Sequence, residues 1–509
     1  MAGGPTLTGT TDTSRIEAPV TIKAYLMCAF AAFGGVFFGY DTGWMGGIMG
    51  MKYYIRQYTG LAYPGPDASQ AEKDAFVLPG WQQSLLTGIL SCGTFSGSII
   101  AGDVADRIGR RWTIIVGCVT FSIGCILETA STSLAVMVVG RLIAGSGVGF
   151  ISAIIILYMS EIAPKKVRGA LVAGYQFCIT IGILLANCVV YATQSRDDTG
   201  SYRIPIAVQF LWAIILGGGL FFLPESPRYF VKKGKLDSAA KALSSVRGQP
   251  VQSQYIQDEL SEIIANHEYE LSVVPQTSYM ASWTNCFRGG LSSASSNLRR
   301  TLLGIGLQMM QQLTGINFIF YYGVVFFASL KTISNPFLIS LVTTLVNVLS
   351  TPVSFWMVER FGRRNLLIFG GTGMVISQYI VGIIGVTVGV GLSTSSNWFW
   401  NCIIAIITPY LVDKQYANLS SKIFFMWGSL CVISVLFAYF LVPETKGLSL
   451  EQVDRMLEEV IPRKSRGWVP HSTFASDMRL EDQGITLNNE KHGVSHVETQ
   501  DSAPNKSFV

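Results

Sequence analysis

The chain has 509 residues, of which 50% are hydrophobic and 14% are charged, and its net charge is +5. An ordinary soluble domain carries about a quarter charged residues, and the mean hydropathy of +0.41 is high, so a soluble protein is excluded. The four histidines and nine cysteines form no catalytic or metal-ligand pattern. We therefore expect no enzymatic activity, no cofactor and no metal, and we assign the positive charge to cytoplasmic loops and not to nucleic-acid binding.

Long apolar segments follow one another along most of the chain. A helix needs about 20 apolar residues to cross a bilayer, and inside hydrocarbon every peptide group must bond internally, which favours helices. Eleven segments meet this description: 24–49, 81–102, 112–130, 133–157, 169–192, 204–223, 301–328, 335–357, 365–391, 397–412 and 421–442. The sequence predicts an all-α membrane protein.

These segments divide the chain into five parts. We expect a cytoplasmic tail at 1–21, a six-helix bundle at 22–223 and a cytoplasmic loop with short helices at 224–300. A second bundle at 301–447 and a largely disordered cytoplasmic tail at 448–509 follow. Basic residues after the second, fourth and sixth segments place those ends in the cytoplasm.

The two bundles repeat a pair of short motifs. Gly-Arg-Arg follows the second segment of each half, at 109–111 and 362–364, and Pro-Glu follows the last segment, at 224–225 and 443–444. From Arg111 to Pro224 is 113 positions (224 − 111), but from Arg364 to Pro443 is only 79 (443 − 364). The shortfall of 34 equals about one spanning helix with a loop. The sequence therefore predicts 6 + 5 helices, with one helix missing between about Val388 and Ser393.

The gap leaves two topologies open. If both 365–391 and 397–412 cross the bilayer, the last helix ends outside and carries Pro443–Gly447 with it. If the short and polar stretch 397–412 does not cross, the tail stays in the cytoplasm, as the positive-inside bias favours.

Several motifs occur together and in a fixed order. They are Gly39-Tyr40-Asp41, Asp106-Arg107-x-Gly109-Arg110-Arg111, Gly140-Arg141-x-x-x-Gly145, Pro-Glu-Ser-Pro-Arg at 224–228, Gln-Gln-Leu-Thr-Gly-Ile-Asn at 311–317 and Pro-Glu-Thr-Lys-Gly at 443–447. In this joint pattern the chain resembles the sugar porter family of the major facilitator superfamily, and most closely fungal monosaccharide transporters. The resemblance implies two pseudo-symmetric helix bundles around a central sugar site. It departs from the family at the missing tenth helix.

Amide side chains inside the apolar segments are candidate sugar ligands, because amides both donate and accept hydrogen bonds without a buried charge. Bonding between membrane helices is the alternative role for such residues. Positions that match the family's sugar ligands are Gln176, Gln311, Gln312, Asn317, Asn347 and the pair Asn397 and Trp398. Gln308 shares a helical face with Gln311 and Gln312.

Asp41 is a carboxylate inside the first segment, where an ionisable residue is costly and usually functional. Arg141 lies at a comparable depth in the fourth segment. Protonation of Asp41 would free Arg141 if the two are paired, and by resemblance this is the proton switch of sugar symporters. A structural ion pair that never titrates is the alternative.

Charged residues at the inner helix ends form a candidate cytoplasmic gate between the halves. They are Asp106, Arg107, Arg110, Arg111, Glu161, Arg168, Glu225, Arg228, Glu359, Arg363, Arg364 and Glu444. Retention of basic residues on the inner side does not explain the acids beside them.

We expect a monomeric, multi-pass protein of the plasma membrane that carries a monosaccharide such as glucose together with protons. Two alternatives stay open: a non-transporting sugar sensor of the same fold, and an inactive product of a skipped exon or faulty gene model. The sugar itself is not identified by an amide array.

Overall fold

The computed structural model describes residues 6–7, 21–64, 67, 69, 72, 75–164, 168–273, 287–290, 297–329, 335–384, 423–445, 448, 450–460, 462–469 and 485–486. The predicted segment 397–412, the site of the missing helix and most of the C-terminal tail lie outside these residues. In the described part, seven helices are long and apolar enough to cross a membrane.

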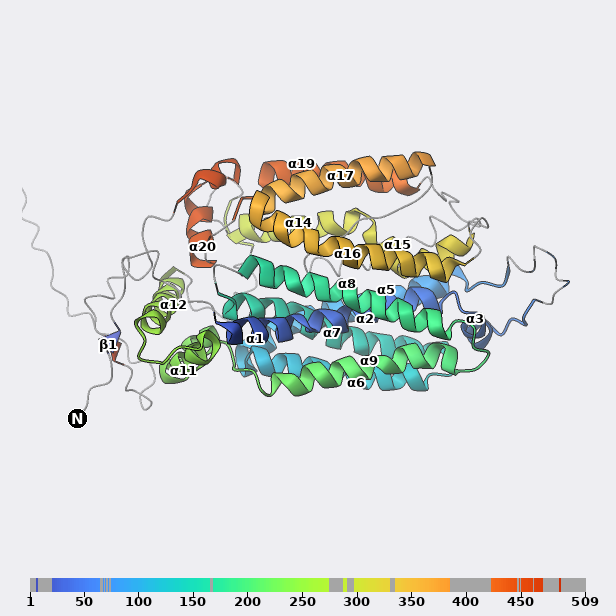
Figure 1. The fold of residues 1–509 in the computed structure, drawn as a ribbon, viewed down its shortest axis with the longest axis horizontal. Coiled ribbons are helices and arrows are strands. Elements are labelled where there is room, and N and C mark those ends of the chain that lie inside the picture. Colours follow the sequence, from blue (N-terminus) through green and yellow to red (C-terminus); the bar gives the residue numbers. More distant parts are fainter. Residues whose placement is uncertain are drawn as a thin grey trace, which may run out of the picture.

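Six spans form the N-terminal half, which occupies the lower layers of Figure 1. The first consists of α1 and α2, which meet at Phe33. The bounds are α1 Ile22–Ala32, α2 Gly34–Ile48, α5 Gly80–Ile108, α6 Arg110–Ala130, α7 Leu134–Ile162, α8 Arg168–Thr193 and α9 Gly200–Leu220. Each overlaps its predicted segment. Helices α5 and α7 extend further than predicted, because their charged inner ends continue as helix beyond the apolar stretch.

Glycines on α7 allow its neighbours to approach closely. A Cβ at Gly145 would overlap the carbonyl of Leu90 on α5, and one at Gly147 would lie 2.5 Å from the backbone nitrogen of Phe121 on α6. Small residues allow this packing where no water drives helices together. Helix α7 is therefore the centre of the N-terminal bundle, between α5 and α6.

The C-terminal half contains α14 Asn297–Leu313, α15 Ile316–Ser329, α16 Pro336–Phe361, α17 Arg363–Ile384 and α19 Ile423–Leu441. The predicted segment 301–328 is not one continuous helix. It breaks at Thr314 and Gly315, where Gly315 has a φ of +79°. The indole of Trp427, on α19, packs against this glycine, and the backbone turns away from a straight helix.

Helices α17 and α19 are antiparallel neighbours (Figure 1). The backbone nitrogen of Arg364, at the start of α17, donates to Glu444 Oε2 beyond the end of α19, at 3.2 Å. The last helix thus returns to the Gly-Arg-Arg side. This arrangement agrees with the topology that keeps Pro443 and Glu444 on the cytoplasmic side.

Short helices cover the two ends of the bundle. At the end predicted to be cytoplasmic lie α10 Pro227–Lys232, α11 Leu236–Arg247 and α12 Gln254–Val273, and α3 Lys52–Thr59 lies at the other end. Arg247 Nη1 donates to the carbonyl of Ile162 at 2.6 Å, which ties α11 to the end of α7. The remaining elements are α20 Leu450–Glu459, the 3₁₀ helix η2 Pro462–Gly467, and the antiparallel pair β1 Thr6–Leu7 and β2 Ile485–Thr486.

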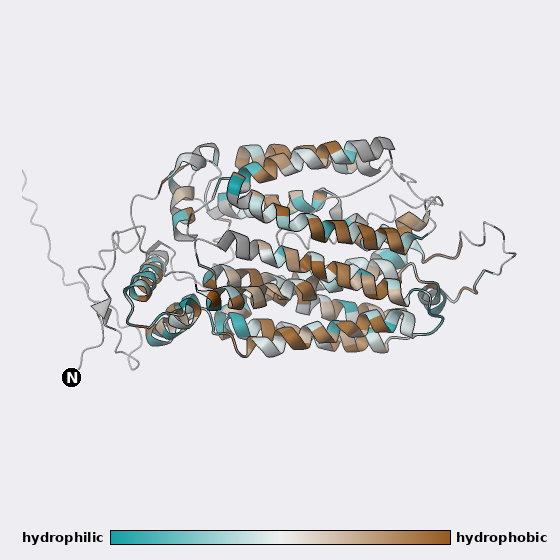
Figure 2. Ribbon diagram, viewed as in Figure 1, coloured by the Kyte–Doolittle hydropathy of each residue, from teal (hydrophilic) through white to brown (hydrophobic). Residues whose placement is uncertain are grey.

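Hydropathy follows this arrangement. Figure 2 shows apolar residues along the long helices and hydrophilic residues on α11 and α12. Large apolar side chains face outward from the bundle, among them Ile214 and Leu349, each 68% exposed. An apolar surface of this extent would be a liability in water, and it fits contact with lipid.

Candidate functional site

The break between α14 and α15 gathers amide side chains from both helix ends. Asn317 Nδ2 donates to Gln312 Oε1 at 2.6 Å across the break. Gln312 is 1% exposed, and Gln308 is also buried. The Oε1 atoms of Gln308 and Gln311 are buried without a hydrogen-bond partner among the described residues. Interrupted helices with free polar groups are a common way to build a substrate site in a membrane.

Two further amides lie on other helices. Asn347 on α16 is 4% exposed, and its Nδ2 has no partner in the described part of the chain. Gln176, on α8, is half-buried. Gln378, which the sequence analysis did not select, donates from Nε2 to the carbonyl of Thr314 at 3.3 Å. The sequence signal for Gln378 was the same as for the other amides, a polar side chain inside an apolar segment. Asn397 and Trp398 lie outside the described residues.

The two halves meet through α15 and α16. Tyr322 OH lies 2.5 Å from Thr87 Oγ1 on α5, and Ser340 Oγ donates to Asn187 Oδ1 on α8 at 3.0 Å. Helix α2 packs against α15, where a Cβ at Gly46 would lie 2.5 Å from the carbonyl oxygen of Phe320. The aromatic run after Asn317 thus forms a wall against the N-terminal half.

A charged cluster lies inside the N-terminal half. Asp41 on α2 and Arg141 on α7 are both 0% exposed. Arg141 Nε donates to the carbonyl of Leu86 at 2.8 Å, and its guanidinium lies 4.9 Å from the centre of the Trp44 ring. The Asp41 oxygens have no hydrogen-bond partner among the described residues. Asp41 and Arg141 attract each other electrostatically, but the predicted pair is not a hydrogen-bonded contact here.

The carboxylate at ion-pair distance from Arg141 is Glu128, on α6. Glu128 Oε1 lies 3.9 Å from Arg141 Nη1, and both side chains are completely buried. The sequence analysis missed Glu128 because it lies near the end of its segment, where a charge can face water. Its position inside an apolar stretch was the same signal that selected Asp41.

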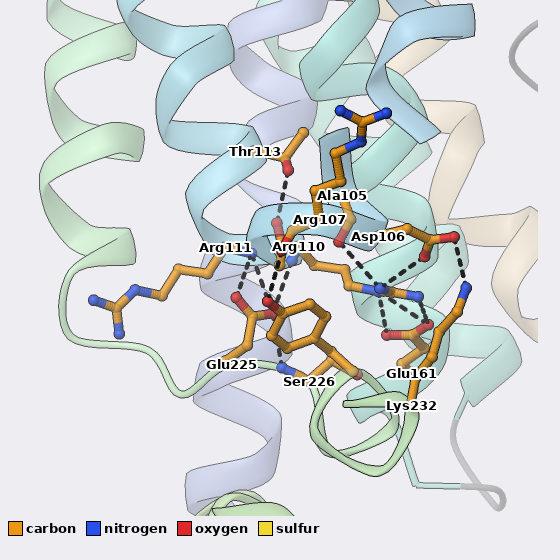
Figure 3. Close-up of polar contacts among 12 residues, drawn as sticks. Ala105, Asp106, Arg107, Arg110, Arg111, Thr113, Glu161, Glu225, Ser226 and Lys232 are labelled. Carbon is orange, nitrogen blue, oxygen red and sulfur yellow. Dashed lines mark hydrogen bonds and ion pairs between the residues drawn. The ribbon is translucent and has the colours of Figure 1, made fainter. Parts of the chain in front are cut away.

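Glu225 holds the start of α6 at the inner end of the first half (Figure 3). Its Oε1 accepts from the backbone nitrogens of Arg110 and Ser226, each at 2.9 Å, and its Oε2 accepts from that of Arg111 at 3.2 Å. A carboxylate at a helix N-terminus is favoured by the free N–H groups and the helix dipole. Burial raises the pKa of Glu225 above its usual value, while the backbone donors and the charge of Arg110 oppose the shift.

Glu225 is also the reason for the glycine at position 109. Gly109 has a φ of +100°, and a Cβ there would overlap the Glu225 carboxylate. The second half repeats this arrangement, since Gly362 has a φ of +82° and a Cβ there would overlap the Glu444 carboxylate. The two sequence motifs of each half are therefore in direct contact.

Arg110 joins three elements of the first half. Its Nε donates to Glu161 Oε2 and its Nη2 to Glu161 Oε1, both at 3.1 Å, and Nη1 donates to the carbonyl of Ala105 at 3.2 Å. Asp106 lies 3.3 Å from Arg110 Nη1 and 2.6 Å from Lys232 Nζ. The side chain of Arg107 points away from this cluster in Figure 3.

Only some of the other gate side chains lie in the described part of the chain. Arg111 Nη1 donates to the carbonyl of Leu223 at 3.0 Å, and Arg364 Nη2 donates likewise to that of Tyr439 at 2.8 Å. Arg228 is half-buried. The side chains of Arg168, Glu359 and Arg363 lie outside the described part.

Comparison with known proteins gives relatives along almost the whole chain. A family model described as "Sugar (and other) transporter" matches residues 27–392 and 386–457. The first match ends and the second begins at residues 386–392, where the sequence predicts a missing helix.

Three fungal relatives are similar to the chain. A major facilitator-type transporter, ecdD of Aspergillus rugulosus, is 40% identical over 88% of this chain and 90% of its own length. The low-affinity glucose transporter HXT1 of Saccharomyces cerevisiae is 33% identical over 91% of this chain and 87% of its own. The high glucose sensor RGT2 of the same yeast is 37% identical over 86% of this chain, which spans only 61% of RGT2.

Solved structures give the same fold at lower identity. The proton:xylose symporter XylE matches with a TM-score of 0.64 and 22% identity, over 86% of this chain and 99% of XylE. A double tryptophan mutant of XylE matches with a TM-score of 0.67. The chain has the major facilitator fold and belongs to the sugar transporter family.

Proposed function

We propose that this chain is a monosaccharide transporter of the plasma membrane, with a hexose as its substrate. It works by proton symport with alternating access. The observation that carries the proposal is the amide cluster at the α14–α15 break. Its substrate ligands are Gln176, Gln311, Gln312, Asn317 and Asn347, together with Asn397 and Trp398. The glucose transporter among the relatives supports the substrate class.

A sugar presents only hydroxyl groups and weakly apolar ring faces. Gln308, Gln311 and Asn347 offer buried polar atoms that lack a partner among the described residues, and an unmet buried polar group is costly. A sugar hydroxyl that reaches these atoms would recover that cost. The Gln312–Asn317 hydrogen bond fixes the direction in which the remaining amide atoms point.

Proton coupling is assigned to Asp41 and Arg141. A buried carboxylate in a membrane helix is costly when ionised and favours proton uptake. Protonation of Asp41 removes the electrostatic attraction between its carboxylate and Arg141, and so weakens the contact of α2 with α7. The XylE neighbour is described as a proton symporter, which supports this direction. We also propose that the chain acts as a monomer, because both halves of the path come from one chain.

A sensor is the second candidate, favoured by the 37% identity with RGT2. The two functions differ in a measurable way, since a sensor binds sugar and does not accumulate it. The uptake measurements below distinguish them.

The first prediction is that Asp41→Asn abolishes uphill, pH-dependent uptake and leaves sugar binding in place. The amide keeps the shape of the carboxyl but cannot exchange a proton. The measurement is accumulation of labelled hexose in cells without their own hexose carriers, with the missing helix restored from a relative. Continued accumulation against a gradient in the variant would exclude coupling through Asp41.

The second prediction concerns the amides. Gln176→Ala and Gln312→Ala should each raise the apparent KM about five- to a hundred-fold, because a lost buried partner costs about 1–3 kcal/mol. Uptake titrations normalised to surface protein measure this. Gln257→Ala, on the cytoplasmic helix α12, is the control and should leave KM unchanged. An unchanged KM in both site variants would return these amides to a structural role.

The third prediction tests the cytoplasmic gate, for which we propose a latch role. Arg110→Ala leaves Glu161, whose side chain is 5% exposed, buried without its ion pair, at a cost of about 3–5 kcal/mol. We expect a clearly lower unfolding temperature in detergent, and partial recovery in the double variant Arg110→Ala/Glu161→Ala. Arg107→Ala is the matched control and should behave like the parent. Equal stability of the Arg110 and Arg107 variants would contradict the ion-pair assignment.

The fourth prediction concerns the 509-residue chain itself, without a restored tenth helix. We expect the last helix to keep its orientation but sugar uptake to be small, because one wall of the path is absent. The sequon Asn418-Leu419-Ser420 should be glycosylated, whereas the tail sequon Asn505-Lys506-Ser507 should not. Mobility shifts in the variants Asn418→Gln and Asn505→Gln, with a protease-protected C-terminal tag, measure this. Normal uptake by the unrepaired chain would refute the expected inactivity.

A further inference from the structure

Glu128 is held against Arg141 by the close contact of α6 and α7. A Cβ at Gly140 would lie 2.9 Å from both the Cγ and the backbone nitrogen of Glu128. The glycine before Arg141 therefore makes room for the Glu128 side chain. Glu128 Oε1 and Arg141 Nη1 are 3.9 Å apart, and neither Glu128 oxygen has a hydrogen-bond partner of ordinary geometry among the described residues.

An aromatic cover lies over this carboxylate. The rings of Tyr54 and Tyr58 on α3 are tilted with their centres 4.5 Å apart, and both meet the ring of Tyr202 on α9 edge to face at 5.6 and 6.1 Å. Tyr58 OH lies 2.7 Å from Ser131 Oγ, and Ser131 Oγ donates to the backbone carbonyl of Glu128 at 2.7 Å. Glu128 lies only two residues before the end of α6, yet it is completely buried.

The charges of the cluster do not balance when every group is ionised. Arg141 is the cation, and Asp41 and Glu128 both interact with it and with each other electrostatically. With both carboxylates ionised, the buried group carries a net charge of −1, which is costly in hydrocarbon. With one proton added, it is neutral.

The groups packed around the cluster do not change this balance in the described chain. Cys125 on α6 and Tyr54 on α3 are neutral near pH 7, and the Gln209 amide on α9 faces Glu128. Arg203 lies over the ring of Tyr202 and interacts electrostatically with Tyr58.

We propose that Glu128 is a second proton-binding carboxyl, and that Asp41 and Glu128 share a single exchangeable proton on either side of an ionised Arg141. In the arrangement described here, Arg141 lies at ion-pair distance from Glu128, and in our proposal Asp41 then holds the proton. When Asp41 releases that proton, Arg141 turns to the Asp41 carboxylate and Glu128 binds the next proton from the outer side. No other reactant is needed, because each step moves one proton.

This inference rests on the proposed function only for its role in transport, so we choose a measurement that needs no transport. The full chain is purified in detergent, and infrared difference spectra between low and high pH report protonated carboxyl groups. The wild type should show one titrating buried carboxyl from the cluster. Both Glu128→Gln and Asp41→Asn should lose that signal, because each leaves one carboxylate that Arg141 neutralises without a proton.

The control is Glu259→Gln, which removes a buried glutamate paired with Arg247 in the cytoplasmic helices, and it should keep the signal. Glu128→Asp keeps an acid, so its signal should persist with a shifted titration midpoint. If Glu128→Gln does not fold, the Glu128→Asp variant tests the proposal in its place. A wild-type signal in Glu128→Gln, or an unshifted midpoint in Glu128→Asp, would overturn the proposal. A signal that persists in Asp41→Asn would show that Asp41 and Glu128 do not share one proton. Absence of uptake in a chain that shows the shared signal and has the missing helix restored would instead refute the proposed transport.

Discussion

An ion inside hydrocarbon must be neutralised by the protein itself, because no water is available to solvate it. Arg141 shows how far this constraint reaches. Its guanidinium contacts the Leu86 carbonyl of α5, the Trp44 ring of α2 and the Glu128 carboxylate of α6. One cation on α7 thus holds three other helices in register. The glycines of α7 allow those helices to come close enough for these contacts.

The same constraint is met differently at the cytoplasmic end, where water is near. There the carboxylates of Glu225 and Glu444 accept from backbone nitrogens at the start of α6 and of α17. Each contact links the end of a half to the third long helix of that half, across 115 residues in the first half and 80 in the second. A glycine with positive φ leaves the space for the carboxylate in both cases. The repeated motifs are therefore one structural unit used twice.

Sequence reasoning predicted the long helices of the described part and the repeat, because these depend on segment length and on motifs at segment ends, while the orientation of the helices in the membrane stays a prediction. It did not predict the break at Gly315, since the apolar pattern continues across residues 314–316 and only the packing of Trp427 reveals the turn. It named Asp41 but not Glu128 as a carboxylate beside Arg141. Depth along a helix can be estimated from a sequence, but the partner depends on the close approach of α6 at Gly140, which is a tertiary contact. Of the amides singled out, Gln308, Gln312 and Asn347 are buried, whereas the bond between Gln312 and Asn317 required the break.

Helix α2 connects the charged cluster with the amide cluster. Asp41 and Trp44 face Arg141, and Gly46 lies against the carbonyls of Phe320 and Tyr321 on α15. The start of α15 carries Asn317, which is bonded to Gln312. A change in the charge of Asp41 alters the forces on α2, and a ligand at the break alters the position of α15. Since the two helices pack without room for a side chain at Gly46, a shift of either helix changes this contact. Coupling between a proton and a sugar then requires no contact between them, only two arrangements of α2 against α15 whose balance both ligands change.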